Sequence, residues 1–351
     1  MPPAARPAPS VSAVLVGYRE DLDDLRRAFA SLRAQSAGVP EIVYVDQREG
    51  DDWAARVRAL EPAATIVGLG QNAGYVEACR AGVAAATGER IFFLNTDAAA
   101  APDCLEQLAV CLDDDPTAAL AGAQVLLPGG REVNAGDNPV HLSGIAWAGR
   151  WGEAPEDGPP REVASASGAA ILVRREAFEA LGGFTPGFFM YYDDVDFAWR
   201  AWLAGWRVLL VPMAVVEHDY VFEKGDYKWR WLERNRLWCV LAHFEARTLL
   251  LLAPLLLAIE LAIVAGAVQG GWIRPKRAAY GELWRSRRAL RERRAYVQAT
   301  RVVGDATYLR LMHPALDSPV FPPAAARLTA PALRLYRWVV LRFVGKGTGR
   351  L

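Results

Sequence analysis

The chain has 351 residues, of which 52% are hydrophobic and 23% are charged, and its formal net charge is zero. This length is enough for one large domain or two, and the composition excludes an intrinsically disordered protein. A neutral chain has no overall electrostatic attraction to nucleic acid, which we therefore do not expect as a partner. Four cysteines without CxxC spacing predict neither a disulfide framework nor a zinc site, and they indicate a reducing compartment such as the cytoplasm.

Short apolar runs alternate with helix-like segments over the first hundred residues. We predict strands at 11–18, 41–46, 65–69 and 90–97, and helices at 23–35 and 72–88, the second of them capped by Gly88. The Pro- and Ala-rich residues 1–10 are expected to form a flexible leader and not a secretory signal. This alternation predicts an α/β fold with a mainly parallel sheet and helices on both faces.

Polar residues stand at the ends of several predicted strands. Tyr18, Asp46 and Asp97 end three of them, and ligands of such sheets bind at the carboxyl ends of the strands. Asp97 offers the oxygen that Mg²⁺ and Mn²⁺ prefer. His218, near the end of the strand-like run 205–219, is a candidate second ligand that favours Mn²⁺. The ordinary alternatives are a turn aspartate and a structural histidine.

A stretch of mixed character follows a predicted loop region at 128–162 and a strand and helix within 166–184. It reads FFMYYDDVDFAWR (188–200) and sets Asp193, Asp194 and Asp196 among aromatic and apolar residues. Buried carboxylates are costly unless they are paired, metal-bound or protonated. The acids can belong to the first turn of a helix, where the macrodipole favours them, or to a catalytic site. The stretch alone leaves both interpretations open.

The C-terminal part contains an apolar segment of 21 residues, 248–268, with Glu260 as its one charge. Its length suffices to cross a bilayer. Ten Lys and Arg against two Glu follow between 271 and 301, and a single crossing would carry them away from the cytoplasm. We therefore expect a helix lying in the cytoplasmic leaflet, with the basic segment on anionic headgroups and 333–345 as a second interfacial contact. A buried helical hairpin, packed on the catalytic domain or on a twin subunit, is the alternative.

Several segments together resemble the family 2 glycosyltransferases, most closely the bacterial branch of rhamnosyltransferases. They are VSAVLVGY, EIVYVD, NAGY with AATGERIFFLNTDA, SGAAILVRREAFEALGGF, FFMYYDDVDFAWRAWLAGWRV, VPMAVVEHD and ERNRLW. The resemblance covers roughly residues 10–240, in the family's order and spacing, and the block from Gly182 to His218 is its most specific part. It implies a GT-A fold, in which a nucleotide-binding αβα sandwich joins an acceptor-binding half.

The resemblance also implies roles for individual residues. Members of the family use a nucleotide-sugar and Mn²⁺ or Mg²⁺, and they invert the anomeric centre. By position, Asp97 and His218 match the metal ligands, and Asp194 in the Asp193-Asp194 pair matches the catalytic base. Asp196 is expected to cap a helix that begins near Phe197. The expected contacts to the nucleotide-sugar are Tyr18, Asp46, Asn72, Gly74, Arg80, Asn95 and Arg236.

The chain departs from the family pattern at four places, one of which is Arg80, where an asparagine is common and where the arginine could reach the diphosphate. Asn95 stands where the metal motif usually begins with an acid, and DQREGDD (46–52) replaces the usual nucleoside loop, which leaves the donor open. Tyr227 replaces the glutamine of the QxxRW motif of processive synthases, which indicates transfer of one or a few sugars. In ERNR (233–236) the arginines and the asparagine are candidates for phosphate contacts, with a solvated helix face as the alternative.

These observations predict a GT-A transferase domain at 11–245 and a membrane-associated helical region at 246–351. We expect transfer of a sugar, with rhamnose favoured, to a glycan or lipid-linked acceptor in cell-envelope polysaccharide synthesis. The favoured donor is dTDP-rhamnose, with UDP- and GDP-sugars behind it. The expected location is the cytoplasmic face of the membrane, as a peripheral or monotopic protein, and a homo-oligomer is compatible with the sequence. The competing hypothesis is an inactive GT-A scaffold or glycan-binding module.

Overall fold

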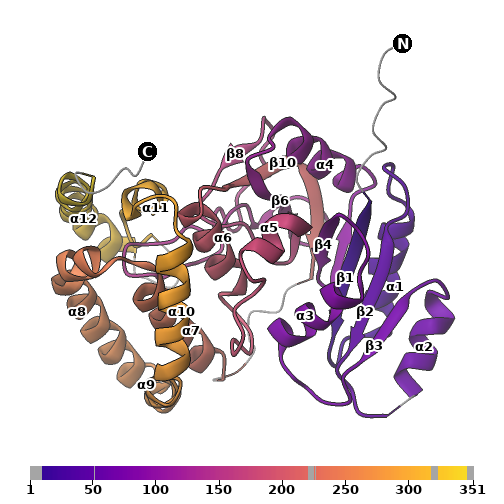
Figure 1. Ribbon diagram of the computed structural model, residues 1–351, viewed down its shortest axis with the longest axis horizontal. Helices are drawn as coiled ribbons and strands as arrows, with labels where there is room; N and C mark the ends of the chain where they lie inside the picture. The colour runs from indigo at the N-terminus through magenta and orange to yellow at the C-terminus, as the bar shows by residue number, and fades with distance from the viewer. Residues whose placement is uncertain (1–9, 51, 220–224, 226, 318–322, 346–351) are drawn as a thin grey trace.

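The computed structural model describes residues 10–50, 52–219, 225, 227–317 and 323–345; the expected leader at 1–10 lies almost entirely outside this range. Figure 1 shows a sheet domain beside a group of helices. The strands are β1 Val11–Gly17, β2 Glu41–Asp46, β3 Thr65–Gly68, β4 Arg90–Leu94, β5 Ala98–Ala100, β6 Ala118–Leu126, β7 Val133–Ala135, β8 Arg161–Glu162, β9 Ala170–Arg174 and β10 Arg207–His218. The helices are α1 Leu22–Arg33, α2 Asp52–Leu60, α3 Tyr75–Ala85, α4 Cys104–Asp114, α5 Arg175–Ala180, α6 Asp193–Leu203, α7 Tyr227–His243, α8 Ala246–Gln269, α9 Ile273–Arg285, α10 Arg287–Thr300, α11 Asp305–Leu311 and α12 Pro323–Val344.

One mixed sheet forms the centre of the molecule, in the order β3-β2-β1-β4-β9-β6-β10-β5. The first four strands are parallel to their neighbours, and β6 is parallel to β10. Only the central strand β9 separates these two groups, because it runs antiparallel to both β4 and β6. The carboxyl ends of β1, β2, β4, β6 and β10 therefore meet at one edge, where the chain also enters β9. The predicted α/β fold is confirmed.

The two faces of the sheet are covered by different helices, and strand residues alternate between them. Ala13, Leu15 and Phe92 join a core with α1, α2 and α4. Val14 and Phe93 belong to a core with α3, α5, α6 and α7. This period-two alternation is what a sheet buried on both sides requires.

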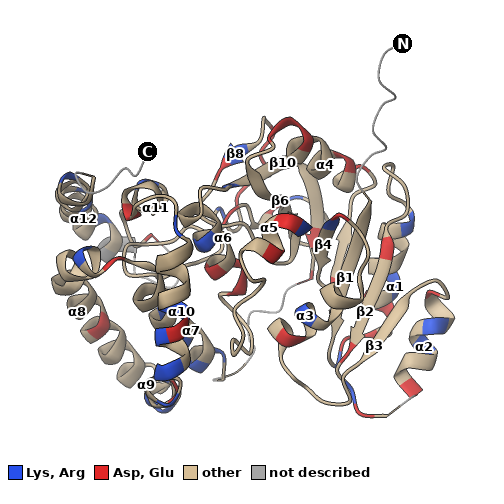
Figure 2. Ribbon diagram, viewed as in Figure 1, with Lys and Arg blue, Asp and Glu red and all other residues tan. Residues whose placement is uncertain are grey.

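The helices after α6 pack on one side of the sheet domain and on one another. α7 lies against α9 and α10, α8 contacts α9 and α12, and α11 packs on α6. Figure 2 shows that Lys and Arg gather on α9 and α10, whereas α8 is almost free of charge. The C-terminal helices are thus joined to the sheet domain through the contacts of α7 and α11 with α6.

Several segments differ from the sequence-based expectation. The predictions omitted α2, α4, β5 and the nine-residue strand β6, and β6 reads AALAGAQVL, whose small residues carry little strand propensity. The helix predicted at 72–88 ends at Ala85 with Ala86 as its C-cap, so Gly88 does not cap it. The loop predicted at 128–162 contains β7 and β8 and buries His141 and Leu142.

Candidate functional site

Asp97 and His218 are brought together by the edge strand β5. This short strand pairs antiparallel with the end of β10, with Ala98 opposite His218, so Asp97 lies directly beside the imidazole. His218 Nε2 is 3.0 Å from Asp97 Oδ1 and 3.3 Å from Asn95 Nδ2. Asn95 and Asp97 of the NTD motif thus lie beside His218 at one corner of the sheet edge, hereafter the metal corner.

The donor set at this corner fits a divalent metal. Octahedral ligands about 2.1 Å from a cation and at right angles to each other are separated by about 3 Å, the spacing of Oδ1 and Nε2 in the structure. A carboxylate oxygen with an imidazole nitrogen suits Mn²⁺, and the carboxylate also suits Mg²⁺. Asp97 is partly exposed, so exchangeable ligands such as water or phosphate oxygens can reach it. The chemistry of the two residues therefore agrees with the metal role that the resemblance implies.

Asp46 and Tyr18 end the neighbouring strands β2 and β1. Asp46 is buried, its Oδ1 accepts a hydrogen bond from the Arg48 amide at 3.0 Å, and burial raises the pKa of its carboxyl. Tyr18 is exposed beside it in register, because Gly17 pairs with Asp46. Arg48 lies over the Trp53 ring at 3.4 Å from its centre. This end of the edge offers a flat cation, an aromatic ring and a buried acid.

The Asn72-Gly74 turn contacts the loop that carries the acids. Asn72 Oδ1 accepts a hydrogen bond from the Gly74 amide at 3.1 Å. Gly74 has a φ of +88°, and a Cβ there would lie 2.5 Å from the Phe189 carbonyl oxygen. That carbonyl accepts from the Tyr75 amide at 2.7 Å. Only glycine allows this approach, which explains the turn sequence and joins it to the stretch 188–200.

Asp193 and Asp194 begin α6, directly after two residues with left-handed backbone. Tyr191 and Tyr192 have φ values of +66° and +65°. Non-glycine residues in this region cost about 1–3 kcal/mol each, and such strain concentrates at functional sites. The turn aims the first residues of the helix at the sheet edge. The first-turn interpretation of the acids is thus confirmed, and their catalytic role stays a prediction.

Asp194 is linked to the metal corner through one dipeptide, Gly168-Ala169. Asp194 Oδ2 accepts from the Gly168 amide at 3.0 Å and from Asn138 Nδ2 at 2.8 Å. The next residue, Ala169, accepts from the Asn95 amide at 3.0 Å. The base predicted by resemblance and the NTD motif therefore stand on opposite sides of the same short segment.

The two acids titrate as a pair. Burial raises the pKa of Asp193 to about 8, with the charge of Asp194 acting in the same direction. Burial also raises the pKa of Asp194, while hydrogen bonds from Gly168, Val195 and Asn138 oppose the shift. Near neutral pH the pair can therefore hold one proton, and the hydrogen bonds favour the charge on Asp194.

Asp196 has a structural role, although not the predicted one. The helix begins at Asp193, so Asp196 is not a cap near Phe197. Its fully buried carboxylate pairs with Arg200 at 2.7 Å and His243 at 3.1 Å, and it accepts from Thr185 Oγ1 at 2.7 Å. Burial alone would raise the pKa of Asp196, but Arg200, His243 and Arg293 together outweigh it and hold that pKa far below the usual range.

The ERNR residues are buried, which contradicts the solvated-face alternative. Asn235 Nδ2 donates to the carbonyl oxygens of Met190 at 2.9 Å and Tyr191 at 2.8 Å, and its Oδ1 accepts from Arg234 at 2.8 Å. Asn235 thus holds the left-handed turn before the acids. This support of the turn could not be predicted from the sequence, in which Asn235 is only an asparagine between two arginines.

Two predicted donor contacts lie elsewhere. Arg236 is only 2% exposed and donates to Glu233 and Glu260, so the structure places it in a buried ion cluster and not at the sheet edge. Arg80 donates to the carbonyl oxygens of Gly182 at 3.4 Å and Phe184 at 3.2 Å and supports that turn. Sequence reasoning missed Asn138 and Gly168, which lie in a predicted loop and at a strand entry, and it expected Asn235 at a phosphate and not at the turn that it contacts.

We expect Asn235→Ala to lower kcat by about 10²-fold, because small displacements of catalytic groups cost rates of this size. Affinity for the donor should stay unchanged, since the side-chain hydrogen bonds of Asn235 go to the turn and to Arg234 and not to a predicted donor contact. In a Tyr191→Gly background the same substitution should cost less, because glycine adopts the left-handed conformation without help. Steady-state kinetics and calorimetry on the four proteins measure this cycle. An equal cost in both backgrounds would contradict the clamp.

Comparison with known proteins agrees with this geometry. Residues 12–182 match the family Glycosyl transferase family 2. An N-acetylglucosaminyl-diphospho-decaprenol L-rhamnosyltransferase of Mycobacterium tuberculosis is 45% identical over 65 residues, which are 18% of this chain and 21% of that one. A pre-mycofactocin glycosyltransferase of the same species is 28% identical over 232 residues, 64% of this chain and 46% of its own.

The fold has solved counterparts. The crystal structure of GalNAc-T7 with UDP, GalNAc and Mn²⁺ matches with a TM-score of 0.57 and 18% identity, over 68% of this chain and 49% of that one. The chain spans between about a fifth and a half of the length of these relatives. Residues 12–182 are therefore similar to Glycosyl transferase family 2, and the architecture around them is an α/β fold of the GT-A type.

Proposed function

We propose that the protein is a metal-dependent, inverting glycosyltransferase that moves a sugar from a nucleotide-sugar to a hydroxyl group. The observation that carries the proposal is the bridge at Gly168-Ala169, which binds Asp194 on one side and Asn95 of the metal motif on the other. A base and a metal corner held on one segment meet the needs of transfer at an anomeric carbon. The family match of residues 12–182 supports the same reaction class.

In the proposed mechanism, the chain's own groups divide the work. A bound Mn²⁺ or Mg²⁺ on Asp97 and His218 would stabilise the charge that develops on the departing diphosphate. Asp194 accepts the proton of the acceptor hydroxyl while the oxygen of that hydroxyl attacks the anomeric carbon. Asp46 and Tyr18 face the nucleoside end, and the Asn72-Gly74 turn supports the loop beneath the base. Asp193 keeps a proton and so lets Asp194 carry the charge.

Rhamnose from a dTDP-sugar is the donor that we favour, and a glycan or lipid-linked glycan is the acceptor. The support is the 45% identity over 65 residues to an enzyme whose name specifies rhamnosyl transfer to a lipid-linked sugar. Since the matched part is short, UDP- and GDP-sugars remain candidates for the test. The four cysteines are all free and buried, in keeping with a reducing cytoplasm. An inactive scaffold is the second candidate, and turnover distinguishes it.

A donor screen tests the proposal. We expect calorimetry with Mn²⁺ or Mg²⁺ to show binding of one nucleotide class, and Asp97→Ala to weaken it at least about tenfold, the lower limit seen when even outer-shell partners of a metal are lost. Asp103→Ala, which removes an exposed carboxylate at the start of α4, should bind as the wild type does. If folded wild-type protein bound no nucleotide, the enzyme proposal would fail and the scaffold would stand.

A further inference from the structure

The helix α8 presents a stripe without charge to solvent. The exposed residues of α8 from Leu250 to Val268 recur at helical spacing and are all apolar: Leu250, Ala253, Pro254, Leu257, Ala258, Leu261, Ala262, Ala265, Gly266 and Val268. Leu257 and Leu261 are each 63% exposed. From Leu250 to Val268 the stripe runs about 27 Å at 1.5 Å per residue. Exposed apolar patches of this size mark an interaction site.

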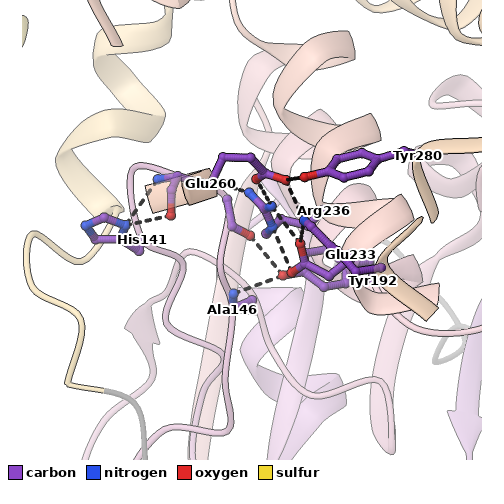
Figure 3. Close-up of polar contacts among 10 residues, drawn as sticks. His141, Ala146, Tyr192, Glu233, Arg236, Glu260 and Tyr280 are labelled. Carbon is purple, nitrogen blue, oxygen red and sulfur yellow. Dashed lines mark hydrogen bonds and ion pairs between the residues drawn. The ribbon is translucent and has the colours of Figure 1, made fainter. Parts of the chain in front are cut away.

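The one acid of α8 lies on its other side. Glu260 accepts hydrogen bonds from Arg236 on α7 and from Lys276 and Tyr280 on α9, and all three are strong contacts to a charged group (Figure 3). In the sequence, Glu260 is the one charge that argues against a membrane-spanning segment at 248–268. In the structure its charge is neutralised by Arg236 and Lys276. The outward side of the helix is left entirely apolar.

A second helix, α12, continues the apolar face. It contacts α8, and the Tyr336 hydroxyl donates to the Leu251 carbonyl oxygen at 2.5 Å. Leu333, Val340 and Val344 are buried on its inner side. Its outer side alternates apolar with cationic residues: Leu328, Leu335, Trp338, Phe343, Arg334 and Arg342. This mixture is typical of helices that lie at a bilayer interface.

The packing argues against a crossing by α8, although it is the one helix among the described residues that is long and apolar enough to span a membrane. A crossing helix needs lipid or apolar partners around its middle. The middle of α8, at Glu260, instead pairs with Arg236 and Lys276, which both also pair with Glu233. The helices α7 and α9 that carry these charges pack against each other and hold exposed arginines, among them Arg274 and Arg277. Such a group cannot be surrounded by hydrocarbon on both sides.

We propose that the outer sides of α8 and α12, hereafter the docking face, insert into one leaflet of an anionic lipid bilayer with both helices parallel to its plane. The apolar stripe would be buried among the acyl chains. The arginines of α12, and those on α9 beside α8, would meet the headgroups, where each cation contributes to attraction. The proposal does not depend on catalysis and stands whether or not the transferase reaction occurs.

Vesicle flotation of the full chain tests the docking face. We expect the wild type to bind vesicles of phosphatidylcholine with phosphatidylglycerol more tightly than vesicles of phosphatidylcholine alone. Leu257→Glu with Leu261→Glu should lower binding at least tenfold. The matched control, Val39→Glu with Val110→Glu, changes two valines in the sheet domain that are each more than half exposed, and it should leave binding unchanged. Equal binding by all three proteins, or none, would overturn the proposal.

Depth measurements separate lying from crossing. Because the native cysteines are buried, nitroxide labels can be attached to single cysteines at Leu250, Leu261 and Val268. An in-plane helix places all three at a similar shallow depth, whereas a crossing places Leu261 near the bilayer centre and the others at opposite surfaces. A crossing profile would overturn the proposal. A second result would also overturn the proposal: a wild type that is a dimer in solution and binds no vesicles, and that becomes a monomer when Leu257→Glu and Leu261→Glu are introduced. The docking face would then pack against a second copy of the chain.

Discussion

Asp194→Asn is expected to lower kcat by about 10²–10⁴-fold, the range that a positioned general base contributes. The amide has almost the same shape, and its oxygen can still accept from Gly168 and Asn138, whose donors lie 3.0 and 2.8 Å from Oδ2. Donor binding should therefore survive while turnover is lost. Calorimetry together with single-turnover kinetics measures the two quantities separately.

The pH profile of the wild type tests the same assignment. Burial raises the pKa of Asp194 above the ordinary value of 3.8. A carboxyl group with a raised pKa keeps its proton to higher pH, and a base acts only after it has lost that proton. The value of kcat/KM should therefore rise with pH, along an acid limb that lies above pH 3.8. A limb at or below that pH would indicate a solvated base.

Asp114→Asn is the matched control, because Asp114 is an exposed acid at the end of α4. It should keep full activity. A proportional loss of donor binding and kcat in Asp194→Asn would point to a folding defect or a donor contact. Wild-type turnover in Asp194→Asn would transfer the role of base to Asp193, which adjoins it in the first turn of α6.

The alternation of strands with helices made the sheet predictable, and the polar ends of β1, β2, β4 and β10 made its functional edge predictable. Parallel strands place their ends together whatever the loops between them do. The strand β6 was not predicted, because its alanines and glycine lack the β-branched residues that are typical of strands. Its position is set by pairing with β9 and β10. Tertiary contacts, not local propensity, make it a strand.

The acids of the candidate site could be named from the sequence, whereas the residues that support them could not. Asp97 and Asp194 stand in recognisable local patterns, but Asn138 lies 56 residues from the carboxylate it contacts and Asn235 more than 40 from the turn it holds. No spacing rule connects such pairs. Arg236 was wrongly predicted as a donor contact for a related reason. An arginine near a phosphate site and an arginine in a buried ion cluster have the same local sequence pattern. Its partner Glu260 belongs to a different helix.

Arg236→Ala is expected to destabilise the protein by about 3–5 kcal/mol, the cost of removing one partner from a buried ion pair. Figure 3 shows its guanidinium between Glu233 and Glu260. Its hydrogen bonds reach Glu233 Oε2 at 2.7 Å, Glu260 Oε2 at 2.5 Å and the Ser143 carbonyl oxygen at 3.1 Å. The alanine variant leaves the buried Glu233 and the partly buried Glu260 with Lys276 as their one remaining cation among the described residues. Denaturant unfolding measures the difference.

A surface ion pair supplies the control for this experiment. Arg26 pairs with Asp23 on α1 with its side chain half exposed, so Arg26→Ala should change stability by no more than about 1 kcal/mol. If Arg236→Ala lowered the stability as little as Arg26→Ala does, Arg236 would not hold Glu260 inward. The ion cluster would then not explain why the outward side of α8 is apolar. If Arg236→Ala alone unfolded at lower denaturant while flotation of its folded fraction persisted, the cluster would be shown to join α7, α8 and α9 without itself touching lipid. The buried charges would then be what allows an otherwise membrane-like helix to lie against a water-soluble transferase domain.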